Sequence, residues 1–203
     1  MSTKFRTREE FIVHIMNRGF AQAADAFSRF LDKPVIMSST QSVLFHSHTG
    51  FSYVHQEKGS LYVLITQLIG AVTGTSYLIF SEQERGEILS AGNSWNFKDY
   101  NDQLKDALLL EIDNIISASV ISELANVLHI EIYGDVPVLK KLDASELQKL
   151  IVDDPGGKKD AGLILMNTEF AIGQKEQIHP QFIWRLDSKI FEKVPESKLL
   201  IAE

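Results

Sequence analysis

Two stretches of the chain repeat hydrophobic residues at the spacing of an α-helix. In the first, Phe11 and Phe27 belong to an apolar series that predicts a helix from Arg8 to about Leu31. Thr7 is placed to cap its first turn, since a threonine hydroxyl can accept a hydrogen bond from a free backbone N–H there. Pro34 ends the stretch, because the residue before a proline avoids the helical region of backbone space.

The second helical stretch runs from about Asp102 to Leu128 and is richer in apolar residues than one stripe requires. The stripe is formed by Leu104, Leu108, Ile112, Ile115, Val120, Leu124 and Leu128. Leu110, Ile116 and Ile121 lie outside it. We therefore expect neighbouring elements to cover this helix on more than one side.

Runs of β-branched and aromatic residues predict the strands. These are Val35–Phe45, Leu61–Ile69, Val72–Phe80, Glu131–Leu139, Ala161–Ala171 and Phe182–Val194. Two short helices are expected between them, at Glu82–Ser90 and Ala144–Val152. Gly70 and Gly74 lack the Gly-Lys-Ser/Thr of a phosphate loop, so they predict a bend or close packing of strands.

The same order of elements occurs twice, which indicates an internal duplication. Each copy has a long helix, a strand through a proline and further strands, with Asn17 matched to Asn114. We expect two half-repeats, about 1–100 and 101–203, that share strands within one domain. The predicted fold class is α+β, with two long helices packed side by side on a largely antiparallel sheet built of swapped half-repeats.

Composition narrows the classes of function. The formal net charge is -7 and there is no basic stripe, so nucleic acid is not expected as a partner. There is no cysteine, which excludes disulfides, thiolate metal sites and cysteine nucleophiles. Met1–Glu10 has no apolar signal-peptide core and no run is long enough to span a bilayer, so the expected location is the cytoplasm, away from membranes.

The candidate chemistry lies on the second long helix. Glu111 and Asn114 are three residues apart, so their side chains share one face. Ala107 and Ala118 lie one turn before and one turn after them, and these small side chains would let another protein approach closely. Taken alone, a Glu-x-x-Asn pair is more typical of a solvated helix face than of an active site.

The segment ALLLEIDNIISASVISELANVLHIEIYGDVP resembles the signature helix of the CheC family. That pattern is Ser/Asp-x-x-x-Glu-x-x-Asn followed, about twenty-two residues later, by proline, and here it is met by Glu111, Asn114 and Pro137. The Ser/Asp position is Ala107, with Asp106 beside it. The segments YVLITQLIGAVTGTSYLIFSEQERGEIL and NRGFAQAADAFSRFLDKPV resemble the family's paired strands and its first helix copy.

The resemblance implies a CheC/CheX/FliY-type phosphatase that hydrolyses the aspartyl-phosphate of a CheY-like response regulator in chemotaxis or two-component signalling. It implies that Asn114 positions the attacking water and that Glu111 docks against a lysine of the receiver domain. Mg²⁺ would belong to the receiver, so this chain is expected to have no cofactor or metal of its own. A CheD-like protein is a further partner that the family suggests.

The first half-repeat departs from the pattern. His14 stands where the glutamate should be, giving a pair with Asn17, and Glu10 lies one turn earlier. Because histidine cannot offer the same carboxylate to a lysine, His14 and Asn17 form either a degenerate second site or a copy kept for packing.

The alternative function is a binding or adaptor protein, FliM-like or CheD-binding, that holds the phosphorylated regulator without hydrolysing it. An intact Glu111/Asn114 pair favours the enzyme, provided that both side chains face solvent on a flat or concave patch. His46, His48 and His55 have a ligand-like spacing but no acid that completes a metal set, so a polar loop is the favoured interpretation. Trp184 is expected in the core or at an edge, and Trp95 is a docking contact if it is exposed.

Overall fold

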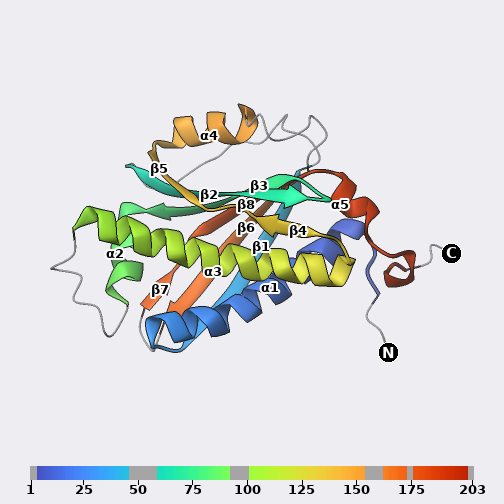
Figure 1. Ribbon diagram of the computed structural model, residues 1–203, viewed down its shortest axis with the longest axis horizontal. Coiled ribbons are helices and arrows are strands. Elements are labelled where there is room, and N and C mark those ends of the chain that lie inside the picture. Colours follow the sequence, from blue (N-terminus) through green and yellow to red (C-terminus); the bar gives the residue numbers. More distant parts are fainter. Residues whose placement is uncertain (1–3, 46–58, 92–100, 154–161, 173–175, 201–203) are drawn as a thin grey trace.

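The computed structural model describes residues 4–45, 59–91, 101–153, 162–172 and 176–200, which form an α+β fold with a strongly curled sheet (Figure 1). The helices are α1 (Arg8–Leu31), α2 (Glu82–Ser90), α3 (Asp102–Leu128), α4 (Ala144–Asp153), α5 (Lys189–Glu192) and the 3₁₀ turn η2 (Glu196–Lys198). The strands are β1 (Val35–Phe45), β2 (Leu61–Gly70), β3 (Gly74–Ser81), β4 (Ile132–Gly134), β5 (Val138–Leu142), β6 (Gly162–Ile172), β7 (Glu176–Ile178) and β8 (Gln181–Leu186).

The sheet interleaves strands from the two parts of the chain. Its order is β1-β6-β8-β3-β2-β4, with β5 also paired to β2 and β7 to β6, and the pairs between these strands are antiparallel. The N-terminal β1 thus pairs with β6, with Val35 opposite Ile172, while β2 carries β4 and β5. This arrangement confirms the predicted fold class. The division into half-repeats near residue 100 stays a prediction.

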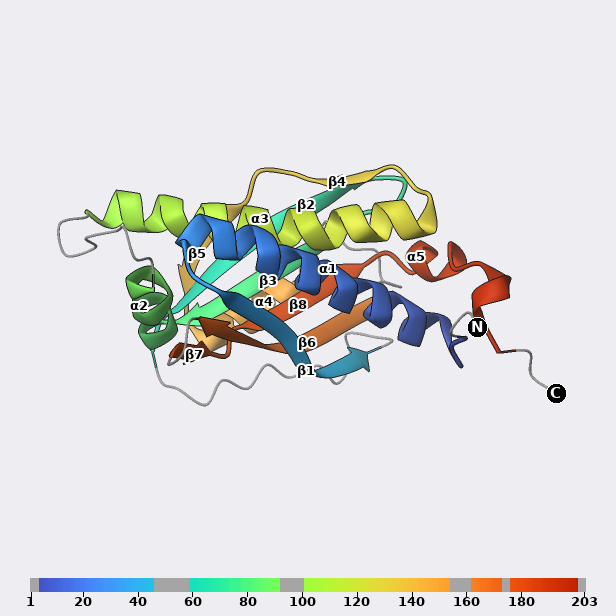
Figure 2. The same ribbon diagram turned by 90° about the horizontal axis from the view of Figure 1, so that it is seen from below.

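The two long helices lie together on one face of the sheet (Figure 2). At their contact, a Cβ added to Gly19 of α1 would lie 2.6 Å from the Cα of Val120 on α3. The two backbones can therefore approach this closely only because glycine has no Cβ. Glu123 of α3 is buried, accepts a hydrogen bond from the side-chain amide of Gln22 of α1 at 2.8 Å, and forms a salt bridge with Arg18 of α1 at 2.8 Å. A large apolar core fills the space between these helices and the sheet.

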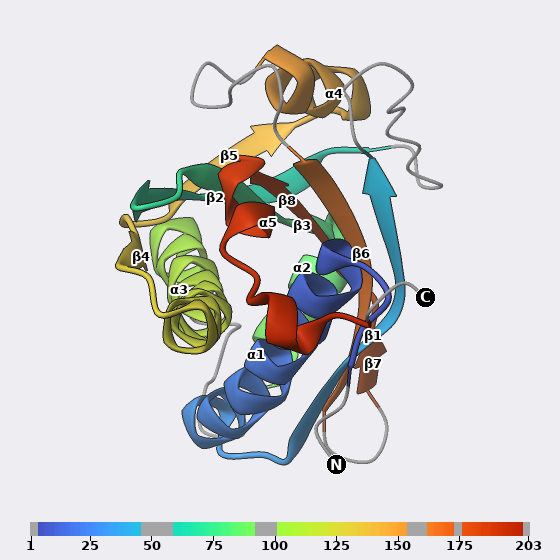
Figure 3. The same ribbon diagram turned by 90° about the vertical axis from the view of Figure 1, so that its right-hand side faces the viewer.

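The opposite face of the sheet is covered by α4 (Figure 3). Leu147 and Ile151 of this helix are buried against Val63, Tyr77 and Ile183 in a second, smaller core. The sequence predicted this helix within one residue at its end but not the face that it covers.

One predicted strand is wrong: Glu131–Leu139 is two strands separated by residues 135–137. The N–H of Asp135 still donates to Gln67 O of β2 at 2.8 Å, but the N–H of Val136 turns to the carboxylate of Asp135 at 2.7 Å. Pro137 has no N–H to give. The sheet pairing is therefore interrupted there and resumes at β5.

The last predicted strand, Phe182–Val194, is also wrong beyond Leu186. The N–H of Asp187 donates to Thr73 O, and its carboxylate accepts from Lys189 N at 3.0 Å, which turns the chain into α5. The short β7 was not predicted, and β3 begins at Gly74 rather than Val72.

Close packing at Gly70 is confirmed. Its φ is +123°, and a Cβ there would lie 2.2 Å from Glu131 O. On α3 the predicted stripe is partly wrong, since Leu104 is 42% exposed while Ile116 and Ile121 are buried. That helix is indeed covered from more than one side, by α1, β2 and β4. In the described part of the chain, no helix is both long enough and apolar enough to cross a membrane.

Candidate functional site

Glu111 and Asn114 lie on the exposed side of α3 and line one cleft with a volume of about 310 Å³. Ala107 and Leu110 of the same helix contribute to it. The facing wall comes from the β4–β5 connection, at Gly134, Asp135, Val136 and Pro137. The structure therefore brings the Glu-x-x-Asn pair and Pro137 together, and both polar side chains face solvent in a concave patch.

Local hydrogen bonds explain how each wall is built. Asn101 caps α3, because its side chain accepts from Leu104 N at 2.9 Å. The facing wall is anchored to β2 by the Asp135–Gln67 backbone bond of 2.8 Å. Gly134 packs against α3 and β2, where an added Cβ would lie 3.0 Å from both Ile121 and Thr66.

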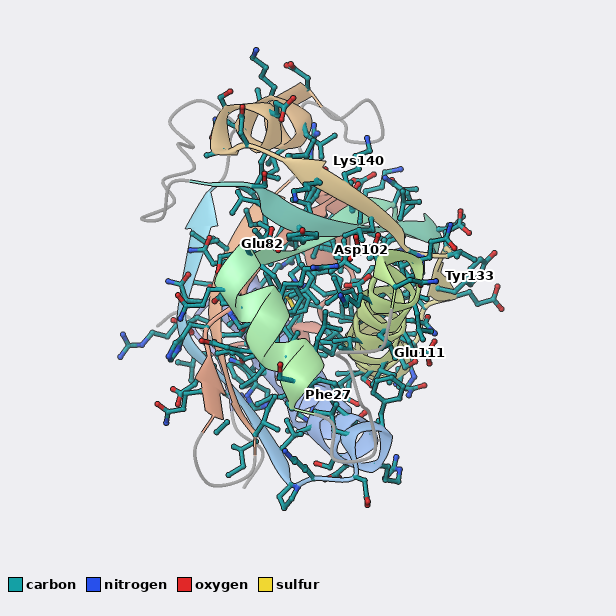
Figure 4. All side chains as sticks on the ribbon, turned by 90° about the vertical axis from the view of Figure 1, so that its left-hand side faces the viewer. Phe27, Glu82, Asp102, Glu111, Tyr133 and Lys140 are labelled. Atoms are coloured by element: carbon teal, nitrogen blue, oxygen red, sulfur yellow. The ribbon has the colours of Figure 1, made fainter. Side chains whose placement is uncertain are left out.

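Large apolar side chains surround the cleft on its β4–β5 side. Tyr133 is 59% exposed, Val136 is 80% exposed and Val138 is 54% exposed. In Figure 4, Tyr133 lies on the same side of the molecule as Glu111. A cluster of exposed apolar groups beside two polar ones is typical of a surface that another protein covers.

A second, larger cleft of about 790 Å³ adjoins the first and shares Leu110 and Pro137 with it. Its centre is Tyr62 of β2, whose hydroxyl donates to Glu82 at 2.9 Å and accepts from Lys141 at 3.0 Å. The hydrogen bond to Tyr62, together with the charge of Glu82, raises the pKa of Lys141. The guanidinium of Arg85 lies 4.5 Å from the centre of the same ring.

Asp106 and Ala107 belong to different clefts. Asp106 pairs with Arg85 at 3.3 Å and lines the second cleft with Glu82 and Asp102, which Figure 4 shows on α2 and α3. Ala107 lines the first cleft. Asp106 therefore does not replace the Ser/Asp of the family pattern beside Glu111.

Sequence reasoning missed a buried carboxylate directly behind the cleft. Asp113 is fully buried and accepts hydrogen bonds from Thr66 Oγ1 of β2 at 2.6 Å and from Ser117 Oγ at 3.0 Å. Burial raises the pKa of Asp113 to about 6, against the opposing effect of these two bonds. The available signal was Asp113 and Ser117 one turn apart on the apolar side of the helix.

The first-repeat pair has different surroundings. His14 and Asn17 are exposed on α1, and the imidazole of His14 packs on the ring of Phe5, with centroids 4.9 Å apart. Glu10 accepts from the backbone N–H of Arg6 at 2.9 Å. Phe5 also pairs with Leu199, so the ring on which His14 packs belongs to a residue that is joined to both terminal segments.

The remaining candidates are placed as follows. Within the described ranges, no group of three or more histidine, aspartate or glutamate side chains could hold a metal ion. His46, His48, His55 and Trp95 lie outside the described residues. Trp184 is buried in the core, as expected.

No family model matches the sequence, and no curated protein does. Solved structures do match. FliY from Thermotoga maritima is 16% identical, with 92% of each chain covered and a TM-score of 0.66. A CheC-like superfamily protein from Shewanella is 12% identical, with 86% of this chain and 97% of that chain covered and a TM-score of 0.55.

A complex titled CheX-CheY-BeF3-Mg+2 from Borrelia burgdorferi also matches, at 15% identity, with 84% of this chain and 97% of that chain covered and a TM-score of 0.50. FliM middle domains are among the further matches. The chain therefore has the fold shared by FliY, CheC-like, CheX and FliM proteins, and the resemblance seen in the sequence is confirmed at the level of the fold.

Proposed function

We propose that this protein is a phosphatase for the aspartyl-phosphate of a CheY-like response regulator, with the Glu111/Asn114 cleft as its active site. The observation that carries the proposal is the position of this pair. A carboxylate and an amide lie exposed in a concave patch with small neighbours and an apolar rim. Both side chains are therefore accessible to a partner that docks on this patch.

Asn114 orients the attacking water. An amide both donates and accepts hydrogen bonds and stays neutral, so it holds a water in line with the scissile bond at any physiological pH. Phosphoryl transfer depends mainly on such positioning and on charge stabilisation. Mg²⁺ bound by the receiver domain neutralises the phosphoryl oxygens, and this chain then supplies no metal.

Glu111 fixes the docked geometry. Glu111 lies three residues before Asn114 on the same exposed helix face. Its carboxylate pairs with a lysine of the receiver. Tyr133 and Val136 cover the partner's adjoining surface, and the second cleft extends this face toward α2. The choice of partner is supported by the shared fold of the CheX–CheY complex.

The test measures the decay of a CheY-like regulator phosphorylated with acetyl phosphate, with and without this protein. Asn114→Ala should lower the acceleration by the order of a hundredfold, the usual scale for one positioned polar group. Asn126→Ala is the matched control, because Asn126 is an exposed asparagine on the same helix outside the cleft. Glu111→Gln should mainly raise KM. Equal rates for Asn114→Ala and Asn126→Ala would reject Asn114 as the catalytic group.

The alternative is a FliM-like binder that holds the phosphorylated regulator without hydrolysing it. FliM middle domains share this fold, and the same cleft and apolar rim would serve for binding alone. Tight binding to the phosphorylated form with unchanged decay would establish this alternative. Acceleration lost in Asn114→Ala would exclude it.

A further inference from the structure

We propose that Asp113 is a positioning residue for the Glu111/Asn114 cleft. It acts through two consecutive residues of β2, Thr66 and Gln67, which are hydrogen-bonded to the two walls of the cleft and together form what we term the strut. The inference rests on the proposed function for its catalytic readout. Asp113 is fully buried, so it touches neither solvent nor a docked partner. Its side chain bonds to Thr66 of the sheet, whereas the next side chain along the helix, Asn114, is exposed.

The first arm of the strut is Thr66 of β2. Its hydroxyl donates to Asp113 Oδ2 at 2.6 Å, a short bond to a carboxylate, which is among the stronger hydrogen bonds in proteins when the acceptor is ionised. Ser117 donates to Oδ1 at 3.0 Å from within α3. Of these two bonds, the one from Thr66 joins the helix to the sheet and so limits how α3 can rotate.

The second arm is the next residue of β2. Gln67 O accepts from the N–H of Asp135, which lies in the opposite wall of the cleft. One dipeptide of β2 therefore holds the helix through Thr66 and the facing wall through Gln67. The separation of the walls, and with it the direction of Asn114, depends on this dipeptide.

The charge of Asp113 couples this strut to pH. The groups that face the carboxylate are two neutral hydroxyls, from β2 and from α3 itself, and β4 brings Gly134 against Thr66. No charged partner of the carboxylate is found among the described residues, and burial raises its pKa to about 6. Above that pH the ionised carboxylate accepts from both hydroxyls. Below it the added proton removes one acceptor position, which loosens the link to β2.

The experiment measures kcat and KM for the phosphorylated regulator from pH 5 to pH 8, each rate divided by the regulator's unaided decay. Wild-type kcat should fall below about pH 6 with KM little changed, and Asp113→Asn should lack this transition. Thr66→Val should lower kcat by about tenfold, the lower end of the loss from one misplaced polar group. Ser117→Ala should have a smaller effect, because its bond stays within α3.

Thr168→Val is the matched control for losing a buried threonine hydroxyl, since Thr168 donates to Pro180 O away from the cleft. It should lower Tm as Thr66→Val does without lowering kcat. Equal effects on kcat of Thr66→Val and Thr168→Val, or of Thr66→Val and Ser117→Ala, would overturn the proposal. So would a wild-type transition that persists in Asp113→Asn.

A readout free of catalysis separates this inference from the proposed function. In NMR spectra, the side-chain amide of Asn114 and the backbone amide of Asp135 should shift together with an inflection near pH 6, and Asp113→Asn should abolish it. If the inflection is present but no regulator is dephosphorylated, the strut stands and the phosphatase fails. If neither amide shows the inflection, the strut fails whatever the activity.

Discussion

Replacing Asp113 by asparagine is expected to change how the stability of the protein depends on pH. Asparagine keeps the size of the side chain and an acceptor for one hydroxyl, and its amide can donate to the other. It removes the titration, and it lacks the second acceptor oxygen equally at every pH. The comparison of the two proteins therefore isolates this one group from the other carboxylates, which titrate in both.

The magnitude follows from the buried position of the carboxyl. Burial raises the pKa of Asp113 in the folded protein from its ordinary 3.8 to about 6, so the folded state retains a proton that the unfolded state has already lost. The stability that this proton contributes is present below pH 3.8 and is lost as the pH rises to about 6. The whole loss is about 3 kcal/mol, at about 1.4 kcal/mol per pH unit.

Urea unfolding, followed by the fluorescence of the buried Trp184, measures the effect. Between pH 5 and pH 8 the free energy of unfolding of the wild type should fall by about 1.4 kcal/mol relative to Asp113→Asn. Curves of the two proteins that run parallel over this range would show that the pKa of Asp113 is not raised, and would refute the reasoning. If the wild type instead became more stable relative to the variant as the pH rises, the pKa of Asp113 would be lowered by folding rather than raised.

Three further outcomes are expected. Gly19→Ala should destabilise the protein by about 1–3 kcal/mol in urea unfolding, because the new methyl group meets the facing helix at 2.6 Å, whereas Gly86→Ala, in an open part of α2, should have no such cost. Val136→Asp should raise KM for the phosphorylated regulator by about tenfold, the scale of losing one apolar contact, without lowering Tm, since its side chain is 80% exposed. His14→Ala and Asn17→Ala should leave the phosphatase rate unchanged; a loss matching that of Asn114→Ala would show a working first site.

Local signals allowed much of the fold to be predicted from the sequence. Helix α1 begins and ends where Thr7 and Pro34 predict, and the Thr7 hydroxyl accepts from Glu10 N at 3.1 Å. Glu111, Asn114 and Pro137, whose spacing carries the resemblance to the family pattern, line one cleft. These features depend on neighbours in the sequence or on a fixed pattern.

What the sequence did not predict depends on contacts between distant segments. Little in the sequence around Asp113 distinguishes it from other helix residues. Its role follows from the hydrogen bond with Thr66, which is far earlier in the chain and is brought next to it by the sheet. The second cleft likewise needs Tyr62, Arg85 and Lys141 to meet from three different elements. The predicted strand is broken at residues 135–137 because the carboxylate of Asp135 accepts a hydrogen bond from the N–H of Val136.

The interleaved sheet has a consequence for any attempt to divide the protein. Segment 1–100 supplies β2, with Thr66 and Gln67, whereas segment 101–203 supplies α3, with Asn114, and the strand β6 that pairs with β1. Two fragments cut near residue 100 should each be unable to complete a sheet, yet should assemble when mixed into a paired complex with a working cleft. The first segment is thus as necessary to the cleft as the helix that carries Asn114, although its own copy of the motif has His14 in place of the glutamate.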